Sequence, residues 1–170
     1  MTRDRDAAGR PRNARPRDGL GRPLEVGQGA GEERIPDDLV LAGPDAAALA
    51  DQLLRAGRPF HAHEVLEASW KFGPAAEREL WQGLAQIAVG LTHAHRGNAR
   101  GAVALLGRGA QRVRAYQAQA VRPVNRDHPY GIDLAAFLAA TDALAVRIEA
   151  HGLAGIPTAD LRPGLITAGR

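Results

Sequence analysis

The sequence predicts an all-α protein, a single compact bundle of about five helices with antiparallel helical hairpins and flexible N- and C-terminal tails. At 170 residues the chain has room for one domain with a full hydrophobic core. Hydrophobic residues make up 45% of the chain but aromatic residues only 4%, so the core must consist of Leu, Ala, Val and Ile. These apolar residues recur at helical spacing, and no segment carries a strand signal.

Composition divides the chain into three parts. Residues 1–35 are rich in Gly, Pro, Arg and Asp and have no apolar period. Such a segment cannot bury enough apolar surface to offset the entropy of ordering it, so a disordered tail is expected. The helical domain is expected over residues 36–151, and the Gly- and Pro-containing residues 152–170 are expected to form a loosely ordered C-terminal tail.

The first two helices are delimited by Pro and Gly. One is predicted between Pro44 and Gly57, where leucines share one side and the glycine provides a C-terminal stop. The next begins with Pro59 in its first turn and runs to about Phe72, before a Gly-Pro breaker.

The third and fourth helices are predicted to form a hairpin. The third, within residues 75–96, is apolar nearly all round, as a central helix should be. Gly83 and Gly90 lie on one side of it, and because glycine weakens a helix, close backbone packing is the expected reason for them. The fourth helix follows Gly97 and Asn98 after a connection short enough to require an antiparallel neighbour. Its buried stripe is predicted to be Val103, Leu106, Ala110 and Val113.

The fifth helix is predicted from its N-terminal signals. Asp133 is a suitable capping residue, and Ile132 before it and Phe137 after it can form a hydrophobic staple. The helix is expected to continue to about His151.

Polar residues share a predicted face with large apolar ones on the second helix. A helical wheel places on the expected buried face Phe60, His63, Leu66, Glu67 and Trp70. The opposite face carries His61, Val65, Ala68 and Ser69, and His61 is expected at the surface. A second polar stripe, on the third helix, consists of Glu79, Gln82, Gln86 and His93. If this stripe faces the second helix, imidazole, carboxylate and amide groups of the two helices lie together in an environment from which water is excluded.

Three stretches carry a family resemblance: "AGRPFHAHEVLEASW", "LWQGLAQIAVGLTHAHRGNARGAVALL" and "YGIDL". With the motif His63-Glu64-x-x-Glu67-x-x-Trp70 they resemble the bacterial and archaeal "domain of unknown function 309" proteins, over roughly Leu49 to Leu144. The residue before Phe60 departs from the pattern, because the family usually has a large residue where this chain has proline. The resemblance implies a small all-helical bundle with a characteristic polar cluster, and it implies no established activity.

Three interpretations of the predicted cluster are open. Its members are His63, Glu64, Glu67, Trp70, Gln82, Gln86 and His93. As a divalent metal site it would use His63, Glu67 and His93 as ligands and Glu64 as a further ligand or base, in a hydrolase-like enzyme. The stretch "HEVLE" is not the metalloprotease motif, because a glutamate occupies the place of the second histidine. Alternatively, the cluster holds a small anionic ligand, or it is a buried hydrogen-bond network that determines helix register.

Positive charge is unevenly distributed, although the net charge is only +3. Residues 80–126 contain no Asp or Glu but several arginines, and Arg100, Arg108 and Arg112 are candidates for weak binding of nucleic acid or another anion. The alternative is a solvated surface.

Other features limit the function class. The chain has no cysteine, which excludes disulfides and thiolate catalysis, and its N-terminus lacks the apolar region of a signal peptide. The lack of cysteine also fits a cytoplasmic location, which is expected. No stretch is apolar enough to span a membrane. The preferred interpretation is a non-catalytic helical binding or scaffolding module, and the alternative is the metal-dependent enzyme above. The sequence identifies no partner, and it leaves open whether the protein is a homo-oligomer.

Overall fold

The computed structural model describes residues 17–18, 20–24, 35–36, 39–119 and 128–166. Most of the predicted N-terminal tail and the last four residues lie outside these ranges. The described part of the chain is all-α, as the sequence predicts. Its described residues form no β-strand and make only two isolated β-bridges. Its elements are α1 (Gly43–Arg55), α2 (Pro59–Phe72), the 3-10 turn η1 (Ala75–Glu77), α3 (Arg78–His95), α4 (Ala99–Ala118), the 3-10 turn η2 (Pro129–Gly131), α5 (Leu134–His151) and the 3-10 turn η3 (Thr158–Leu161).

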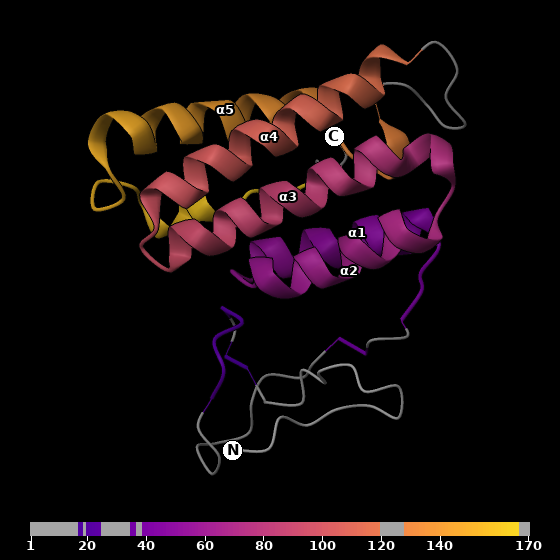
Figure 1. Cartoon of the computed structure of the whole chain (residues 1–170), viewed down its shortest axis with the longest axis horizontal. Helices are drawn as coiled ribbons and strands as arrows, with labels where there is room; N and C mark the ends of the chain where they lie inside the picture. Colours follow the sequence, from indigo (N-terminus) through magenta and orange to yellow (C-terminus); the bar gives the residue numbers. More distant parts are fainter. Residues whose placement is uncertain (1–16, 19, 25–34, 37–38, 120–127, 167–170) are drawn as a thin grey trace.

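Consecutive helices are neighbours, and α3 is central. It packs against α2 on one side and against α4 on the other, while α1 packs against α2 and α5 against α4. Figure 1 shows α4 and α5 along one side of the molecule and α1 and α2 along the other, with α3 between them. None of the described helices is both long and apolar enough to cross a bilayer.

The predicted helix ends are confirmed by their caps. The Asp133 side chain accepts a hydrogen bond from the amide of Ala136 at 2.9 Å, and Asn98 caps α4 in the same way through the amide of Gly101 at 2.9 Å. Gly57 follows the C-cap of α1 and has a φ of 73°, a left-handed conformation that glycine adopts without strain. It therefore stops the helix there, as predicted.

Glycines let α3 and α4 approach closely, as predicted for Gly83 and Gly90. A Cβ atom added to Gly83 would lie 2.8 Å from the carbonyl oxygen of Gly109 on α4, and one added to Gly90 would lie 3.0 Å from the amide nitrogen of Leu106. At these two positions the backbone of α3 therefore packs directly against the backbone of α4.

The prediction for the buried face of α2 is wrong. The buried residues of α2 are Pro59, His61, Ala62, Val65, Leu66 and Ser69. Phe60, His63 and Trp70, expected inside, are only partly buried, whereas His61 is buried. The reason is that α2 packs against both α1 and α3, so the side with Ala62 and Ser69, where side chains are small, lies inside.

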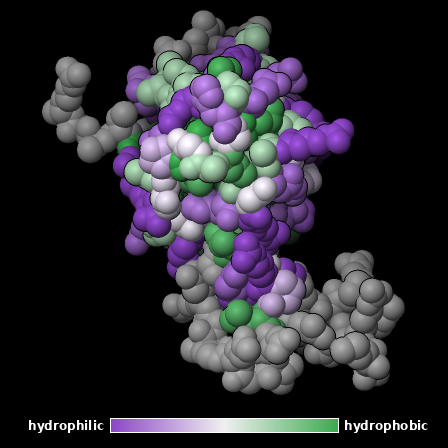
Figure 2. Space-filling view, turned by 90° about the vertical axis from the view of Figure 1, so that its left-hand side faces the viewer, coloured by the Kyte–Doolittle hydropathy of each residue, from purple (hydrophilic) through white to green (hydrophobic). Residues whose placement is uncertain are grey.

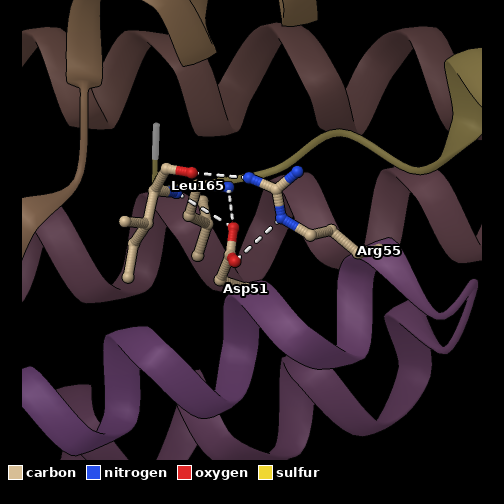
Figure 3. Close-up of polar contacts among 4 residues, drawn as sticks. Asp51, Arg55 and Leu165 are labelled. Carbon is tan, nitrogen blue, oxygen red and sulfur yellow. Dashed lines mark hydrogen bonds and ion pairs between the residues drawn. The ribbon is translucent and has the colours of Figure 1, made fainter. Parts of the chain in front are cut away.

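The described part of the segment after α5, up to Ile166, contacts the bundle. Leu161 and Leu165 are buried in the core, and the Leu165 carbonyl oxygen accepts a hydrogen bond from the Asp133 amide. Asp51 of α1 accepts hydrogen bonds from the amides of Leu165 at 2.6 Å and Ile166 at 2.9 Å. Figure 3 shows these contacts together with Arg55, which donates to the Ile166 carbonyl oxygen. Polar contacts with α1 therefore hold this segment against the bundle.

Replacing Asp51 with Ala is expected to release the end of the chain. The substitution leaves two amides without their acceptor, which should lower the free energy of unfolding by about 2 kcal/mol. Hydrogen exchange at Leu165 and Ile166 should accelerate far more than exchange in α3. Unchanged protection of these two amides would contradict the role assigned to Asp51.

Candidate functional site

The motif residues His63 and Glu67 lie one turn apart on the outer side of α2. The His63 Nε2 atom is 3.7 Å from Glu67 Oε2, and Glu67 Oε1 is 2.8 Å from Lys71 Nζ. The side chains of His63 and Glu67 are 24% and 35% exposed. Lys71 also lies 5.8 Å from the centre of the Trp70 ring, so Glu67 and Trp70 both contact one cation.

The surroundings of His63 favour its neutral form. Burial lowers the pKa of His63 below its ordinary value, against the opposing charge of Glu67, and Lys71 lowers it further. Its Nδ1 atom is buried and has no hydrogen-bond partner within the described ranges.

A recess lies beside this pair of residues. It has a volume of about 300 Å³ and is open to solvent. Its lining residues are Ile35, Pro36, Glu64, Glu67, Ala68, Lys71 and Phe72. Phe72 is 65% exposed, which makes it one of the few large apolar side chains that the described surface exposes.

The polar stripe of α3 faces α4, whereas the predicted cluster requires it to face α2. Arg112 of α4 donates to both carboxylate oxygens of Glu79, at 3.0 and 2.9 Å. Gln86 lines a recess of about 350 Å³ between α3 and α4, and His93 Nδ1 lies 2.7 Å from the Asn98 side-chain nitrogen. Gln86 and His93 therefore contact α4 residues or the turn before α4.

The structure brings together only part of the predicted site. His63, Glu67 and Trp70 lie within three turns of α2, and Glu64 lines the recess beside them. Gln82 is partly buried on α3, and the Gln86 side-chain oxygen is buried without a hydrogen-bond partner in the described chain. Among the residues that the structure describes, no three His, Cys, Asp or Glu side chains form a group that could hold a metal ion. The three predicted metal ligands thus do not form a metal site there.

The candidate arginines of α4 do not form one patch. Arg108 and Arg112 line the recess with Gln86, and Arg112 is paired with Glu79. Arg100 lies at the other end of α4, beside α5. In the folded chain, arginines of the acid-free residues 80–126 therefore pair with carboxylates from outside that range, as Arg112 does with Glu79 and Arg114 with Asp142.

A buried polar cluster that the sequence analysis missed lies at the start of α3. Glu77 is 2% exposed, and its carboxyl oxygens accept hydrogen bonds from Trp81 Nε1 at 2.8 Å and from the Tyr130 hydroxyl at 2.6 Å. The rings of Trp81 and Tyr130 are stacked, with centroids 5.5 Å apart. Burial and the hydrogen bond to Glu77 raise the pKa of Tyr130. The one-turn spacing of Glu77 and Trp81 is visible in the sequence and could have indicated their hydrogen bond. The hydrogen bond between Glu77 and Tyr130 joins residues that are 53 positions apart.

Comparison with known proteins finds a similarity to one protein family. Residues 48–105 match the family model described as "Domain of unknown function (DUF309)". Over this segment the chain is similar to the DUF309 family. The matched DUF309 segment begins within α1, ends within α4 and includes the whole of α2. The family description assigns no activity.

A curated relative is similarly uninformative about activity. The "uncharacterized protein YpuF" of Bacillus subtilis (strain 168) is 40% identical over 72 residues, which cover 41% of this chain and 40% of the relative. The similarity thus spans less than half the length of the relative. No solved structure matches the chain significantly.

Two histidines are expected to make the stability of the protein depend on pH. Burial lowers the pKa of His63 and of His95, whose Nε2 atom lies 3.2 Å from the Leu161 carbonyl oxygen. Their ordinary pKa in the unfolded chain is about 6.5, so below that pH the unfolded state binds more protons than the folded state. The free energy of unfolding should therefore fall as the pH drops from about 6.5 through the lower folded pKa values.

Urea titrations at a series of pH values measure this dependence. Replacing both histidines with Asn should reduce the slope between about pH 6.5 and 5.5 relative to the wild-type protein. An equal slope in the two proteins would contradict the assignment.

Proposed function

We propose that this DUF309 domain is a non-catalytic binding or scaffolding module of the cytoplasm, and that the recess on the outer side of α2 takes a segment of a partner protein. The observation that supports this proposal is the position of the recess, which has both the motif residue Glu67 and the exposed Phe72 in its lining. An exposed aromatic side chain beside charged groups is typical of the anchoring residues in protein interfaces.

The chemistry of the lining indicates the kind of segment. Carboxylates of Glu64 and Glu67 lie beside the apolar surface of Phe72 and Ala68, which suits a segment that carries a cationic and an apolar side chain. Glu67 is already paired with Lys71, but exposed ion pairs contribute only about 0 to 1 kcal/mol. A cation from the partner can therefore replace Lys71 at little free-energy cost.

Site-specific photo-crosslinking in cells tests the proposal. A photoreactive amino acid at Phe72 should give a discrete adduct with one partner protein, identified by mass spectrometry, and Glu67→Arg in the same chain should abolish it. The matched control is the same photoreactive group at Val40, which is 57% exposed and lies outside the recess. Failure of position 72 to give an adduct, or the same adducts from position 40, would contradict the proposal.

Elemental analysis separates this function from the metal-dependent alternative. For a binding module the purified protein should contain no stoichiometric divalent metal, and chelators should leave its melting temperature unchanged. A stoichiometric metal that is lost in both Glu67→Gln and His93→Ala would instead support the enzyme that uses His63, Glu64, Glu67 and His93.

A further inference from the structure

Two described pieces of the N-terminal region lie next to α1 and α2. One comprises residues 17–18 and 20–24, and the other residues 35–36. Figure 1 shows both on the side of the α1–α2 layer that faces away from α3. Ile35 and Pro36 also belong to the lining of the recess beside Glu67. The outer side of α2 is therefore in contact with N-terminal residues of its own chain.

The first of these pieces is a turn that is held together by its own hydrogen bonds. The Asp18 side chain accepts hydrogen bonds from the amides of Leu20 at 2.9 Å and Arg22 at 2.8 Å. Arg17 and Pro23 form an isolated β-bridge across the turn. Because an aspartate that bonds nearby amides stabilises a turn locally, this turn can contact the bundle or leave it as one unit.

The N-terminal turn packs on Phe60, near the start of α2. A Cβ atom added to Gly21 would lie 2.3 Å from the Cγ atom of Phe60, so the turn approaches the ring through a glycine. The Arg17 guanidinium lies 5.4 Å from the centre of the same ring, and Arg96 donates to the Leu20 carbonyl oxygen at 3.0 Å. Figure 2, which faces this end of the bundle, shows mainly hydrophilic atoms between the body of the molecule and the N-terminal part below it.

Ile35 and Pro36 lie between two recesses of the outer surface. They line the recess beside Glu67 and also a second recess, of about 300 Å³. The other lining residues of the second recess come from α1 and the turn after it, and they are Leu49, Gln52, Leu53, Ala56 and Arg58. Ile35 is partly buried against the hydrophobic core. Because both recesses end at the same two residues, Ile35 and Pro36 separate what would otherwise be one groove over α1 and α2.

These N-terminal residues have the chemistry expected of the partner segment, which is a cationic and an apolar side chain. Arg17 is the cation, over the Phe60 ring, and Ile35 is the apolar residue. The ring of Phe60 lies 6.1 Å from that of His63, which is next to Glu67. The two contacts therefore lie on either side of the motif residues of α2.

We propose that the N-terminal turn and Ile35 cover the outer side of α2 as an intramolecular competitor, which the partner segment must displace in order to bind. The partner segment then presents an arginine to the Phe60 ring and a branched apolar side chain at the place of Ile35. A competitor in the same chain has an effective concentration of roughly millimolar, so it weakens partner binding until it is displaced. This inference rests on the proposed function, because it concerns the occupant of the same surface.

Thiol reactivity measures whether Ile35 covers the recess. The chain has no cysteine of its own, so Ala68→Cys places a single thiol in the recess lining. Adding Ile35→Asp should raise the rate of its reaction with a maleimide by roughly three- to tenfold, equivalent to about 0.7 to 1.4 kcal/mol. With the thiol placed instead at Val146, which is exposed on α5, Ile35→Asp should leave the rate unchanged. Equal rates at position 68 with and without Ile35→Asp would overturn the proposal.

Fluorine NMR of the full chain, with 4-fluorophenylalanine at position 60, reports on the turn. Gly21→Val should release the turn, because valine resists the φ of 72° and its side chain would overlap the Phe60 ring. The fluorine resonance should then shift and become sensitive to replacing H₂O with D₂O. Gly152→Val is the matched control, since Gly152 has a φ of 70° but an added Cβ atom meets nothing within 4 Å. Identical spectra for Gly21→Val and wild type, with circular dichroism showing both folded, would overturn the proposal.

Photo-crosslinking at position 72 then connects the competitor with partner binding. The double variant Gly21→Val and Ile35→Asp should raise the yield of the partner adduct by roughly tenfold, equivalent to about 1.4 kcal/mol, and Gly152→Val should not. An adduct of equal yield in the wild type and the double variant would overturn the competition. Raised thiol reactivity at position 68 without an adduct from any of these proteins would contradict the proposed function, while it would support the covering of α2 by its own chain.

Discussion

Gly109→Ala is expected to lower the free energy of unfolding by about 2 kcal/mol, although alanine is the better helix former. The added methyl group would lie 2.6 Å from the Gly83 carbonyl oxygen and 2.9 Å from the Ile87 amide nitrogen. Both are backbone atoms of α3, so the clash can be relieved only by separating the two helices. Urea denaturation monitored by circular dichroism measures the change.

Gly107→Ala is the matched control on the same helix. Gly107 is exposed, and an added methyl group would meet nothing within 4 Å, so this substitution should stabilise the protein by about 0.5 to 1 kcal/mol. The two substitutions should therefore have opposite signs. Stabilisation by Gly109→Ala would show that α3 and α4 are not in backbone contact.

Glu77→Ala is expected to have an effect of similar or greater size, about 3 kcal/mol. It removes the acceptor of two hydrogen bonds, and the Trp81 indole, which is 1% exposed, cannot reach water instead. The stacked rings of Trp81 and Tyr130 would then also lose the carboxyl group that holds them together.

One milder variant separates the contributions of the two hydrogen bonds, and a surface variant is the control. Tyr130→Phe removes one donor and keeps the bond to Trp81, so it should cost about 1 kcal/mol. Glu149→Ala, at an exposed position of α5, should change stability by less than about 0.5 kcal/mol. If Glu77→Ala is no more harmful than Glu149→Ala, the buried cluster does not stabilise the fold.

The helix positions could be predicted because their signals are local. Proline at the start of α2, glycine after α1 and Asp133 before α5 each act on the backbone within one turn. The need for close packing at Gly83 could also be predicted, since an interior glycine weakens a helix unless contact compensates. Neither inference required knowledge of which helices are neighbours.

The candidate site was harder to predict because a helical wheel does not show where the neighbours lie. On α2 the largest side chains were assigned to the inside, but contact with both α1 and α3 buries His61 and leaves His63 and Glu67 partly exposed. On α3 the polar stripe meets α4, where Glu79 pairs with Arg112. The family motif was identified correctly from the sequence, but its surroundings were not.

By itself, the sequence determined the all-α class, the five helices with their ends, and the DUF309 motif, because capping, turn chemistry and periodicity act over a few residues. Only the tertiary structure decided which side of α2 is buried, which carboxylates neutralise the arginines of α4, and how Asp51 and Glu77 hold distant segments. These contacts join residues that are tens of positions apart, up to 115 for Asp51 and Ile166. They depend on how the helices pack, and no local pattern encodes that packing.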